Sequence, residues 1–129
     1  MNSPRRTKQK EVIFEALLSA GRPMSPQEIL SAAKLSVPLI SLGTVYRVIS
    51  GLLESRQIAA VPVPGEPDRY ELQIRAAHHH HHFHCNGCRR VFDVPGCGLK
   101  IEAQLPAGFS VSRHEVMLYG RCGSCAEVP

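Results

Sequence analysis

The sequence contains no tryptophan, few aromatic residues and no long apolar segment. Aromatic residues make up 5% of the 129 residues, and no apolar run approaches the roughly 18 residues that a membrane-spanning helix needs. No apolar signal-peptide core follows the basic N-terminal residues, and the H-E-x-x-H and nucleophile motifs of hydrolases are absent. We therefore expect a soluble, cytoplasmic protein that does not bind membranes and is not an enzyme.

Positive charge is concentrated in the first half of the chain. Residues 1–65 hold eight Lys and Arg residues against four acids, whereas residues 66–129 hold seven of each. The formal net charge of +4 therefore arises entirely from the first half. Such asymmetry is typical of a nucleic-acid-binding face, although a basic N-terminal run can also be a solvated arm.

Four of the five cysteines form two Cys-x-x-Cys pairs. Cys85 and Cys88 form one pair, Cys122 and Cys125 form the other, and Cys97 is left over; 33 residues separate the pairs. Each pair can donate two thiolates to one tetrahedral zinc ion, and in an intracellular protein such pairs favour a structural zinc site. Two redox-active dithiols are the alternative interpretation.

Three helices followed by a hairpin are predicted in the N-terminal half. Apolar residues recur at helical spacing over residues 7–20 and again over residues 41–55. Between them, Ser25-Pro26-Gln27-Glu28 is a capping box that predicts the start of a second helix. Strands at residues 57–61 and 68–72 are separated by prolines and a glycine, which predict a stiff, wide turn.

This order of elements predicts a winged helix-turn-helix, in which the third helix enters the major groove of DNA. Its exposed face would carry Ser41, Thr44, Tyr46 and Arg47. Tyr46 would offer an aromatic body to thymine methyl groups, and Arg47 a guanidinium to phosphate or guanine. An ordinary three-helix bundle, in which Tyr46 packs and Arg47 is solvated, stays open on this pattern alone.

The composition becomes β-rich, His-rich and Cys-rich in the second half. We predict strands at residues 78–84 and 90–94, a short helix at 98–105, and one or two strands at 109–119. The expected fold class is α+β. It comprises a winged helix over residues 1–72, a hinge at 73–77, and a small α/β domain over 78–129 that the zinc knuckles close.

Six of the seven histidines lie in one run before the first cysteine pair. The run lies inside the chain rather than at a terminus, which argues against an expression tag. Because side chains alternate along a strand, His78, His80, His82 and His84 would share one face, and His79 and His81 the other. One strand could thus supply two metal sites. Candidate ligands on other segments are Glu71, Asp93, Glu102, His114 and Glu115.

Together these motifs resemble the ferric uptake regulator family. The resemblance rests on Thr44-Val45-Tyr46-Arg47, the histidine run, the segment 114–120 and the two cysteine pairs, and it covers nearly the whole chain. It implies a dimeric repressor with an N-terminal winged helix, a C-terminal α/β dimerisation domain and a regulatory metal between them. Such a homodimer would bind an A/T-rich operator in double-stranded DNA and silence metal-uptake genes.

The resemblance also implies roles for individual residues. The structural zinc ligands would be Cys85, Cys88, Cys122 and Cys125. The regulatory metal would bind Glu71, His80, His82 and Asp93, and a third metal site would use His79, His81, Glu102 and His114. The DNA contacts would come from Arg6, Lys10, Thr44, Tyr46 and Arg47.

One histidine ligand of the family is missing, because the segment before the second helix is Gly21-Arg22-Pro23-Met24-Ser25. The structural metal would be Zn²⁺. For the regulatory site the sequence favours Fe²⁺ or Zn²⁺ about equally and allows Mn²⁺, and Cys97 could supply a thiolate to a zinc sensor. The alternatives without DNA binding are a metal-buffering protein and a small zinc hydrolase with Glu71, Glu102 or Glu115 as its base.

Overall fold

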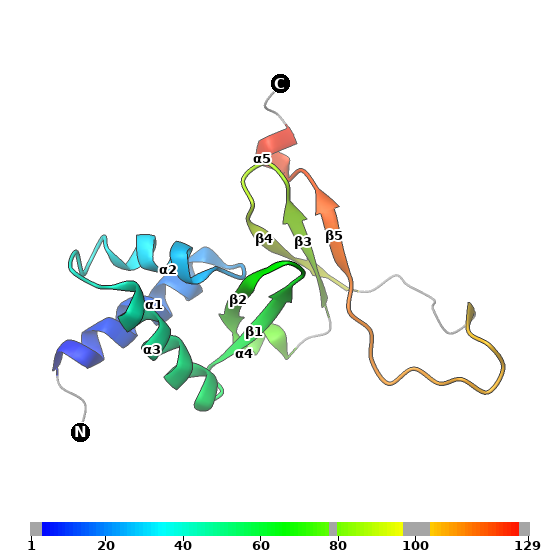
Figure 1. Cartoon of the computed structure of the whole chain (residues 1–129), viewed down its shortest axis with the longest axis horizontal. Coiled ribbons are helices and arrows are strands. Elements are labelled where there is room, and N and C mark those ends of the chain that lie inside the picture. The colour runs from blue at the N-terminus through cyan, green and yellow to red at the C-terminus, as the bar shows by residue number, and fades with distance from the viewer. Residues whose placement is uncertain (1–3, 78–79, 97–103, 127–129) are drawn as a thin grey trace. The chain divides into compact units, whose positions relative to one another are not determined.

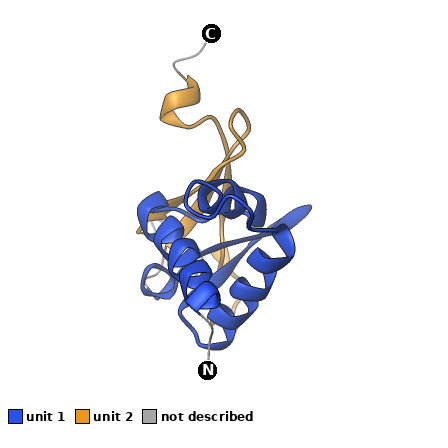
Figure 2. Ribbon diagram, turned by 90° about the vertical axis from the view of Figure 1, so that its left-hand side faces the viewer, with its two compact units in different colours: residues 1–78 blue, residues 79–129 orange. Residues whose placement is uncertain are grey.

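The computed structural model describes residues 4–77, 80–96 and 104–126, and Figure 1 labels their helices and strands. The chain divides into two units, residues 1–78 and 79–129 (Figure 2). The residues of the predicted hinge, 73–77, include the short helix α4 (Gln73–Ala76) in unit 1. In the described part of the chain, no helix combines the length and apolar character needed to cross a membrane.

Unit 1 contains three helices at the positions that the apolar spacing predicts: α1 (Pro4–Ala20), α2 (Pro26–Ala33) and α3 (Leu42–Glu54). The predicted capping box begins α2. The Ser25 hydroxyl accepts the Glu28 N–H at 3.1 Å, and the Glu28 carboxylate accepts the Ser25 N–H at 3.2 Å. Ser41 caps α3, because its hydroxyl accepts the Thr44 N–H at 3.2 Å.

The apolar faces of these helices form one core. Its central side chains are at most 2% exposed: Ile13, Leu17, Ile29, Val45, Ile49 and Leu52. Ile58 and Leu72 from the following hairpin join them. Burial of one such side chain contributes about 1.5–3 kcal/mol. Because α2 has only 8 residues, packing against this core, rather than intrinsic propensity, stabilises it.

The hairpin pairs β1 (Ile58–Val63) with the antiparallel strand β2 (Glu66–Leu72). Its connection is the dipeptide Pro64-Gly65, so the predicted wide turn is wrong. Gly65 has a φ of +76°, which a glycine adopts without strain, so the chain can turn directly after Pro64. The pairing register shifts between Val61 and Val63, around a proline that has no N–H to donate. Both strands therefore continue closer to the turn than the prolines suggest.

Ion pairs and main-chain hydrogen bonds join the hairpin to α2. Both Arg22 and Arg69 contact the Glu28 carboxylate, at 2.7 and 2.9 Å, and Arg69 is only 6% exposed. Met24 and Tyr70 exchange two backbone hydrogen bonds, at 2.9 and 2.8 Å. The segment before α2 is thereby held beside β2, and the hairpin is fixed to the helices as a wing.

Unit 2 is built on a three-stranded sheet with the order β4-β3-β5, visible in Figure 1. The central strand β3 (His80–Cys85) is antiparallel to β4 (Val91–Pro95) and parallel to β5 (Met117–Gly120). The short helix α5 (Gly123–Ala126) follows β5. The strands predicted at 78–84 and 90–94 thus correspond to β3 and β4.

The segment between β4 and β5 contains less strand than the sequence predicts. Of the predicted strand or strands at 109–119, only residues 117–119 belong to a strand, and residues 109–116 belong to none. Phe109, the first residue of the predicted range, is 68% exposed, so its side chain does not pack against the described part of the sheet. The helix predicted at 98–105 falls mostly on residues 97–103, which lie outside the described residues.

Candidate metal centres and nucleic-acid interface

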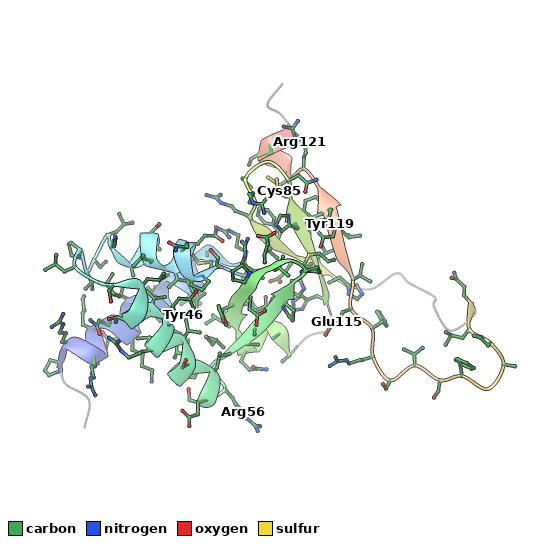
Figure 3. All side chains as sticks on the ribbon, viewed as in Figure 1. Tyr46, Arg56, Cys85, Glu115, Tyr119 and Arg121 are labelled. Carbon is green, nitrogen blue, oxygen red and sulfur yellow. The ribbon has the colours of Figure 1, made fainter. Side chains whose placement is uncertain are left out.

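The four cysteines of the two Cys-x-x-Cys pairs come together in unit 2. The Sγ atoms of Cys85, Cys88, Cys122 and Cys125 lie within 4.8 Å of one another, and none forms a disulfide. Cys88 Sγ lies 3.9 Å from Cys122 Sγ. Four thiolates around a tetrahedral zinc ion, each at about 2.3 Å, would be roughly 3.8 Å apart. The donor set and its spacing therefore fit a zinc ion. Figure 3 labels Cys85 at the end of β3.

The turn between β3 and β4 brings the two pairs together across the sheet. The Asn86 N–H donates to the Gly120 carbonyl at 2.7 Å, which joins this turn to the end of β5. Gly87 leaves room for the second pair, since a Cβ there would lie 2.9 Å from Cys125 Sγ. Any larger residue at position 87 would displace a sulfur of the cluster.

Backbone N–H groups and neighbouring sulfurs shift the pKa values of two cysteines of the cluster in opposite directions. The N–H groups of Cys122, Cys88 and Gly87 lie 3.3–3.4 Å from Cys85 Sγ and lower the pKa of that thiol to about 5. Hydrogen bonds to the sulfurs of Cys85 and Cys122 raise the pKa of the Cys125 thiol to about 12. Cys85 is thus a thiolate at neutral pH, the form that binds metal.

A second group of ligand atoms lies on the β3–β4 pair. His80 and His82 are alternate residues of β3, and Asp93 is directly opposite His82 on β4. Asp93 Oδ1 lies 3.1 Å from His80 Nε2 and 3.3 Å from His82 Nε2. Two imidazole nitrogens that converge on a carboxylate oxygen form a donor set suited to Fe²⁺, Zn²⁺ or Mn²⁺.

The opposite face of β3 carries part of the expected third metal site. The rings of His81 and His114 lie 5.1 Å apart, centroid to centroid. The other two residues assigned to this site, His79 and Glu102, lie outside the described residues.

Glu71, expected at the regulatory site, is on β2 of unit 1, opposite Ala59. His84 packs beside Tyr119, with ring centroids 5.7 Å apart.

The outer face of α3 presents two of the residues predicted to contact DNA. Tyr46, labelled in Figure 3, is 46% exposed, and Arg47 is also exposed. Thr44, in contrast, is only 8% exposed, so its predicted place on the exposed face is wrong. Its hydroxyl accepts hydrogen bonds from Ser41 Oγ at 3.1 Å and from Arg47 Nη2 at 2.8 Å. Thr44 is therefore part of the capped first turn and holds Arg47 along the helix.

The sequence also matches a known family over most of its length. The family model described as "Ferric uptake regulator family" matches residues 2–119. The chain belongs to the ferric uptake regulator family. Ferric uptake regulator proteins are DNA-binding, metal-responsive transcriptional regulators, and this chain is such a regulator.

Two relatives show the extent of the similarity. The chain is 28% identical over 124 residues to the "Ferric uptake regulation protein" of Campylobacter jejuni, covering 92% of this chain and 78% of that protein. It is equally identical, over 124 residues, to the "Peroxide operon regulator" of Bacillus subtilis, covering 94% and 83%. The names of these relatives refer to different signals, ferric iron in one and peroxide in the other.

Solved structures of the ferric uptake regulator family share the fold. The Helicobacter pylori ferric uptake regulator is 24% identical, with a TM-score of 0.72, and the match covers 98% of this chain and 83% of that chain. FurB of Mycobacterium tuberculosis, a zinc uptake regulator, is 27% identical, with a TM-score of 0.52 and coverage of 94% and 95%.

The segment that lacks the family's histidine has other roles in this ferric uptake regulator protein. Arg22 pairs with Glu28, Pro23 is buried, and Met24 bonds to the backbone of Tyr70. None of these three side chains offers the imidazole nitrogen that the family often places there.

Sequence reasoning did not single out Gln9, which is 8% exposed and lies between the basic residues Arg6 and Lys10 of α1. Arg6, Gln9 and Lys10 have the spacing i, i+3, i+4, which puts them on one helical face. That spacing is the signal by which Gln9 could have been found.

Proposed function

We propose that this ferric uptake regulator protein is a cytoplasmic, homodimeric repressor whose affinity for operator DNA rises when a regulatory metal ion binds. The observation that carries the proposal is the convergence of His80, His82 and Asp93 in a chain that also has a basic winged helix. A metal-buffering protein would need the convergent metal ligands but not the basic winged helix.

The cysteine cluster would hold a structural Zn²⁺ ion. Unit 2 has about 50 residues, a size at which a hydrophobic core alone is often insufficient and metal commonly contributes. Four sulfur donors within 4.8 Å of one another support this assignment. Cys85, Cys88, Cys122 and Cys125 would thus contribute to folding rather than to sensing.

The regulatory ion would be held by His80, His82 and Asp93 of unit 2 together with Glu71 of unit 1. The three ligands on unit 2 are supported by their short mutual distances, and Glu71 by the family resemblance. Because the ligands come from both units, a bound ion would restrict the orientations that the two winged helices of a dimer adopt. Orientations that match the operator would then be more populated, which raises the affinity for DNA.

Fe²⁺ and Zn²⁺ are both suitable for this set of nitrogen and oxygen donors, and Mn²⁺ is a third candidate. Zn²⁺ accepts four protein ligands, whereas Fe²⁺ and Mn²⁺ would complete a larger coordination shell with water. A further ion could bind at His81 and His114, with His79 and Glu102 as the remaining ligands. FurB, a zinc uptake regulator at 27% identity, supports zinc, and the Campylobacter relative supports iron.

DNA recognition would depend on α3. Tyr46 and Arg47 would reach base edges in the major groove, and Thr44 would act as a positioning residue for Arg47. Arg6 and Lys10, exposed on α1, would contact phosphates. Since phosphate contacts release counterions, we expect the affinity to fall steeply with salt concentration.

The test uses protein from which the exchangeable metal has been removed, while the zinc at the cysteine cluster is retained. Its binding to genomic promoter fragments is measured in anaerobic buffer, with and without Fe²⁺, Zn²⁺ or Mn²⁺. We expect the sensed metal to tighten binding at least tenfold, about 1.4 kcal/mol. Arg47→Ala should weaken DNA binding and leave the metal content unchanged, while Arg113→Ala, an exposed arginine of unit 2, should change neither.

Two results would contradict the proposal. Equal DNA affinity with and without every metal would exclude metal-dependent repression. Metal binding without any DNA affinity would instead indicate a metal-buffering protein.

A further inference from the structure

A cavity of about 520 Å³ opens between α1 and α3 in unit 1. Arg6, Gln9 and Lys10 line it from α1, and Thr44, Arg47 and Val48 from α3. Its volume lies in the range of about 300–1,000 Å³ that is typical of sites for small molecules. The cavity lies wholly within unit 1, so its shape does not depend on unit 2.

The rim of this cavity is cationic. Arg6, Lys10 and Arg47 contribute three positive charges, and none of the described residues that line the cavity is acidic. Arg47 is held in place because its Nη2 donates to Thr44 Oγ1 at 2.8 Å, and Ser41 Oγ donates to the same oxygen at 3.1 Å. A guanidinium fixed in this way is prepared to bind an anion at little cost in conformational entropy.

Behind the rim, the lining of the cavity mixes apolar and polar groups. Val48 contributes an aliphatic side chain, Ser55 contributes a hydroxyl, and Leu52, 1% exposed, adds only the edge of its side chain. Gly51 has no side chain, which leaves open space beside α3. Gln9 is 8% exposed and lines the same cavity. Its amide can donate and accept hydrogen bonds at once, as recognition of a heterocycle requires.

We propose that this cavity binds a small organic phosphate with a heterocyclic body, of the nucleoside monophosphate class. The phosphate would lie among the three cationic side chains, and the heterocycle would contact Val48 and Leu52 and hydrogen-bond to Gln9. A backbone phosphate of duplex DNA would use only the rim, because its sugars tie it to the duplex and its bases are stacked. The aliphatic, amide and hydroxyl groups behind the rim therefore favour a free ligand.

Such a ligand would compete with DNA for Arg6, Lys10 and Arg47. Bound nucleotide would then relieve repression without removing any metal. This regulatory consequence rests on the proposed function, whereas binding of the ligand does not.

The first experiment titrates the zinc-loaded full chain with adenosine 5′-monophosphate, adenosine or inorganic phosphate by calorimetry. Gly51→Leu is the blocking variant, since its Cβ meets nothing within 4 Å and leucine favours a helix more than glycine does. Gly51→Ala is the matched control, which adds one methyl group. Gln9→Leu removes the amide at nearly constant size.

We expect the monophosphate to bind at least about tenfold more tightly than phosphate or adenosine alone, since only the monophosphate uses both rim and interior. Gly51→Leu should weaken its binding by a similar factor, and Gln9→Leu should weaken it less, while Gly51→Ala should not. The proposal is overturned by no measurable binding, by equal binding to Gly51→Leu, or by phosphate binding as tightly as the monophosphate. Unchanged circular dichroism confirms that each variant folds.

A second experiment adds the monophosphate to the metal-loaded complex with operator DNA. Release of DNA by the wild type, but not by Gly51→Leu, supports competition. Retention of DNA despite saturated nucleotide binding overturns it. Absence of DNA binding under every condition contradicts the proposed function instead. Nucleotide binding is then tested by the calorimetric experiment alone.

Discussion

His82 and Asp93 are directly opposite each other on adjacent antiparallel strands, and His82 Nε2 lies 3.3 Å from Asp93 Oδ1. Because side chains alternate along β3, His80 lies on the same face as His82, and His80 Nε2 lies 3.1 Å from the same Asp93 Oδ1 atom. The geometry of the β3–β4 ladder thus sets the positions of these three side chains. Side chains on regular strands are held more rigidly than side chains on loops.

Asp93→Asn tests whether this carboxylate binds the exchangeable metal. The amide has the same shape but no negative charge, so we expect the affinity for that metal to fall by about tenfold or more. Elemental analysis after mild EDTA treatment and metal readdition measures the effect. Glu54→Gln, at an exposed carboxylate on α3, is the control and should retain the metal. Equal metal content in both variants would exclude Asp93 as a ligand.

Cys88→Ser tests the structural role of the cysteine cluster. Structural zinc contributes apparent free energies of about 10–16 kcal/mol in zinc-finger peptides, so loss of a ligand should unfold a unit as small as unit 2. We expect loss of the tightly bound zinc and fast amide exchange in β3, with protection of α1 unchanged. Cys97→Ser is the control, because Cys97 belongs to neither pair. A folded, zinc-containing Cys88→Ser protein would contradict the assignment.

Zinc binding to the cysteines should release protons. At neutral pH the pKa of Cys125, raised to about 12, keeps its thiol protonated, whereas the pKa of Cys85, lowered to about 5, makes it a thiolate. Cys125 must lose its proton to bind, so we expect release of at least about one proton per zinc and an affinity that falls as the pH is lowered. Calorimetry in buffers of different ionisation enthalpy counts these protons. Zero release at pH 7 would show that Cys125 does not coordinate.

Much of this arrangement could be predicted because it follows from local spacing. The capping box joins Ser25 to Glu28, only three residues further along, so the start of α2 follows from the local sequence. Because side chains alternate along β3, His80 and His82 lie on the opposite face from His81. The cysteine pairs indicate that two distant segments meet, because each pair supplies only half of a tetrahedral site.

The failures arise where non-local packing decides the structure. The position of Thr44 in the third helix predicts an exposed side chain, but hydrogen bonds with Ser41 and Arg47 place it in the capped turn. The prolines of the hairpin suggested a wide turn, whereas a positive φ at Gly65 allows a tight one. Residues 109–119 predict one or two strands, yet residues 109–116 lie outside any strand and Phe109 is exposed. A sequence shows which side chains are apolar, but not which find a partner.

The partly buried carboxylate of Glu28 supplies one more prediction. Burial alone would raise its pKa, but hydrogen bonds from the Arg22 side chain and the Ser25 backbone, with the charges of Arg22 and Arg69, lower it below 4.5. A carboxyl whose pKa is lower in the folded state stabilises the fold above its unfolded pKa. This contribution is lost as the pH falls through the folded value.

Glu28→Gln should therefore destabilise unit 1 at pH 7 and make its stability less sensitive to acid. Removing the charge leaves the guanidinium of Arg69, which is 6% exposed, without its carboxylate partner on α2, and we expect a cost of about 1–3 kcal/mol. Urea unfolding followed by amide exchange in α2 measures this cost at pH 7 and again below pH 4. The control is Glu15→Gln, an exposed carboxylate on α1. If Glu28→Gln and wild type lose stability equally between these pH values, the ion pairs with Arg22 and Arg69 do not hold the wing to α2.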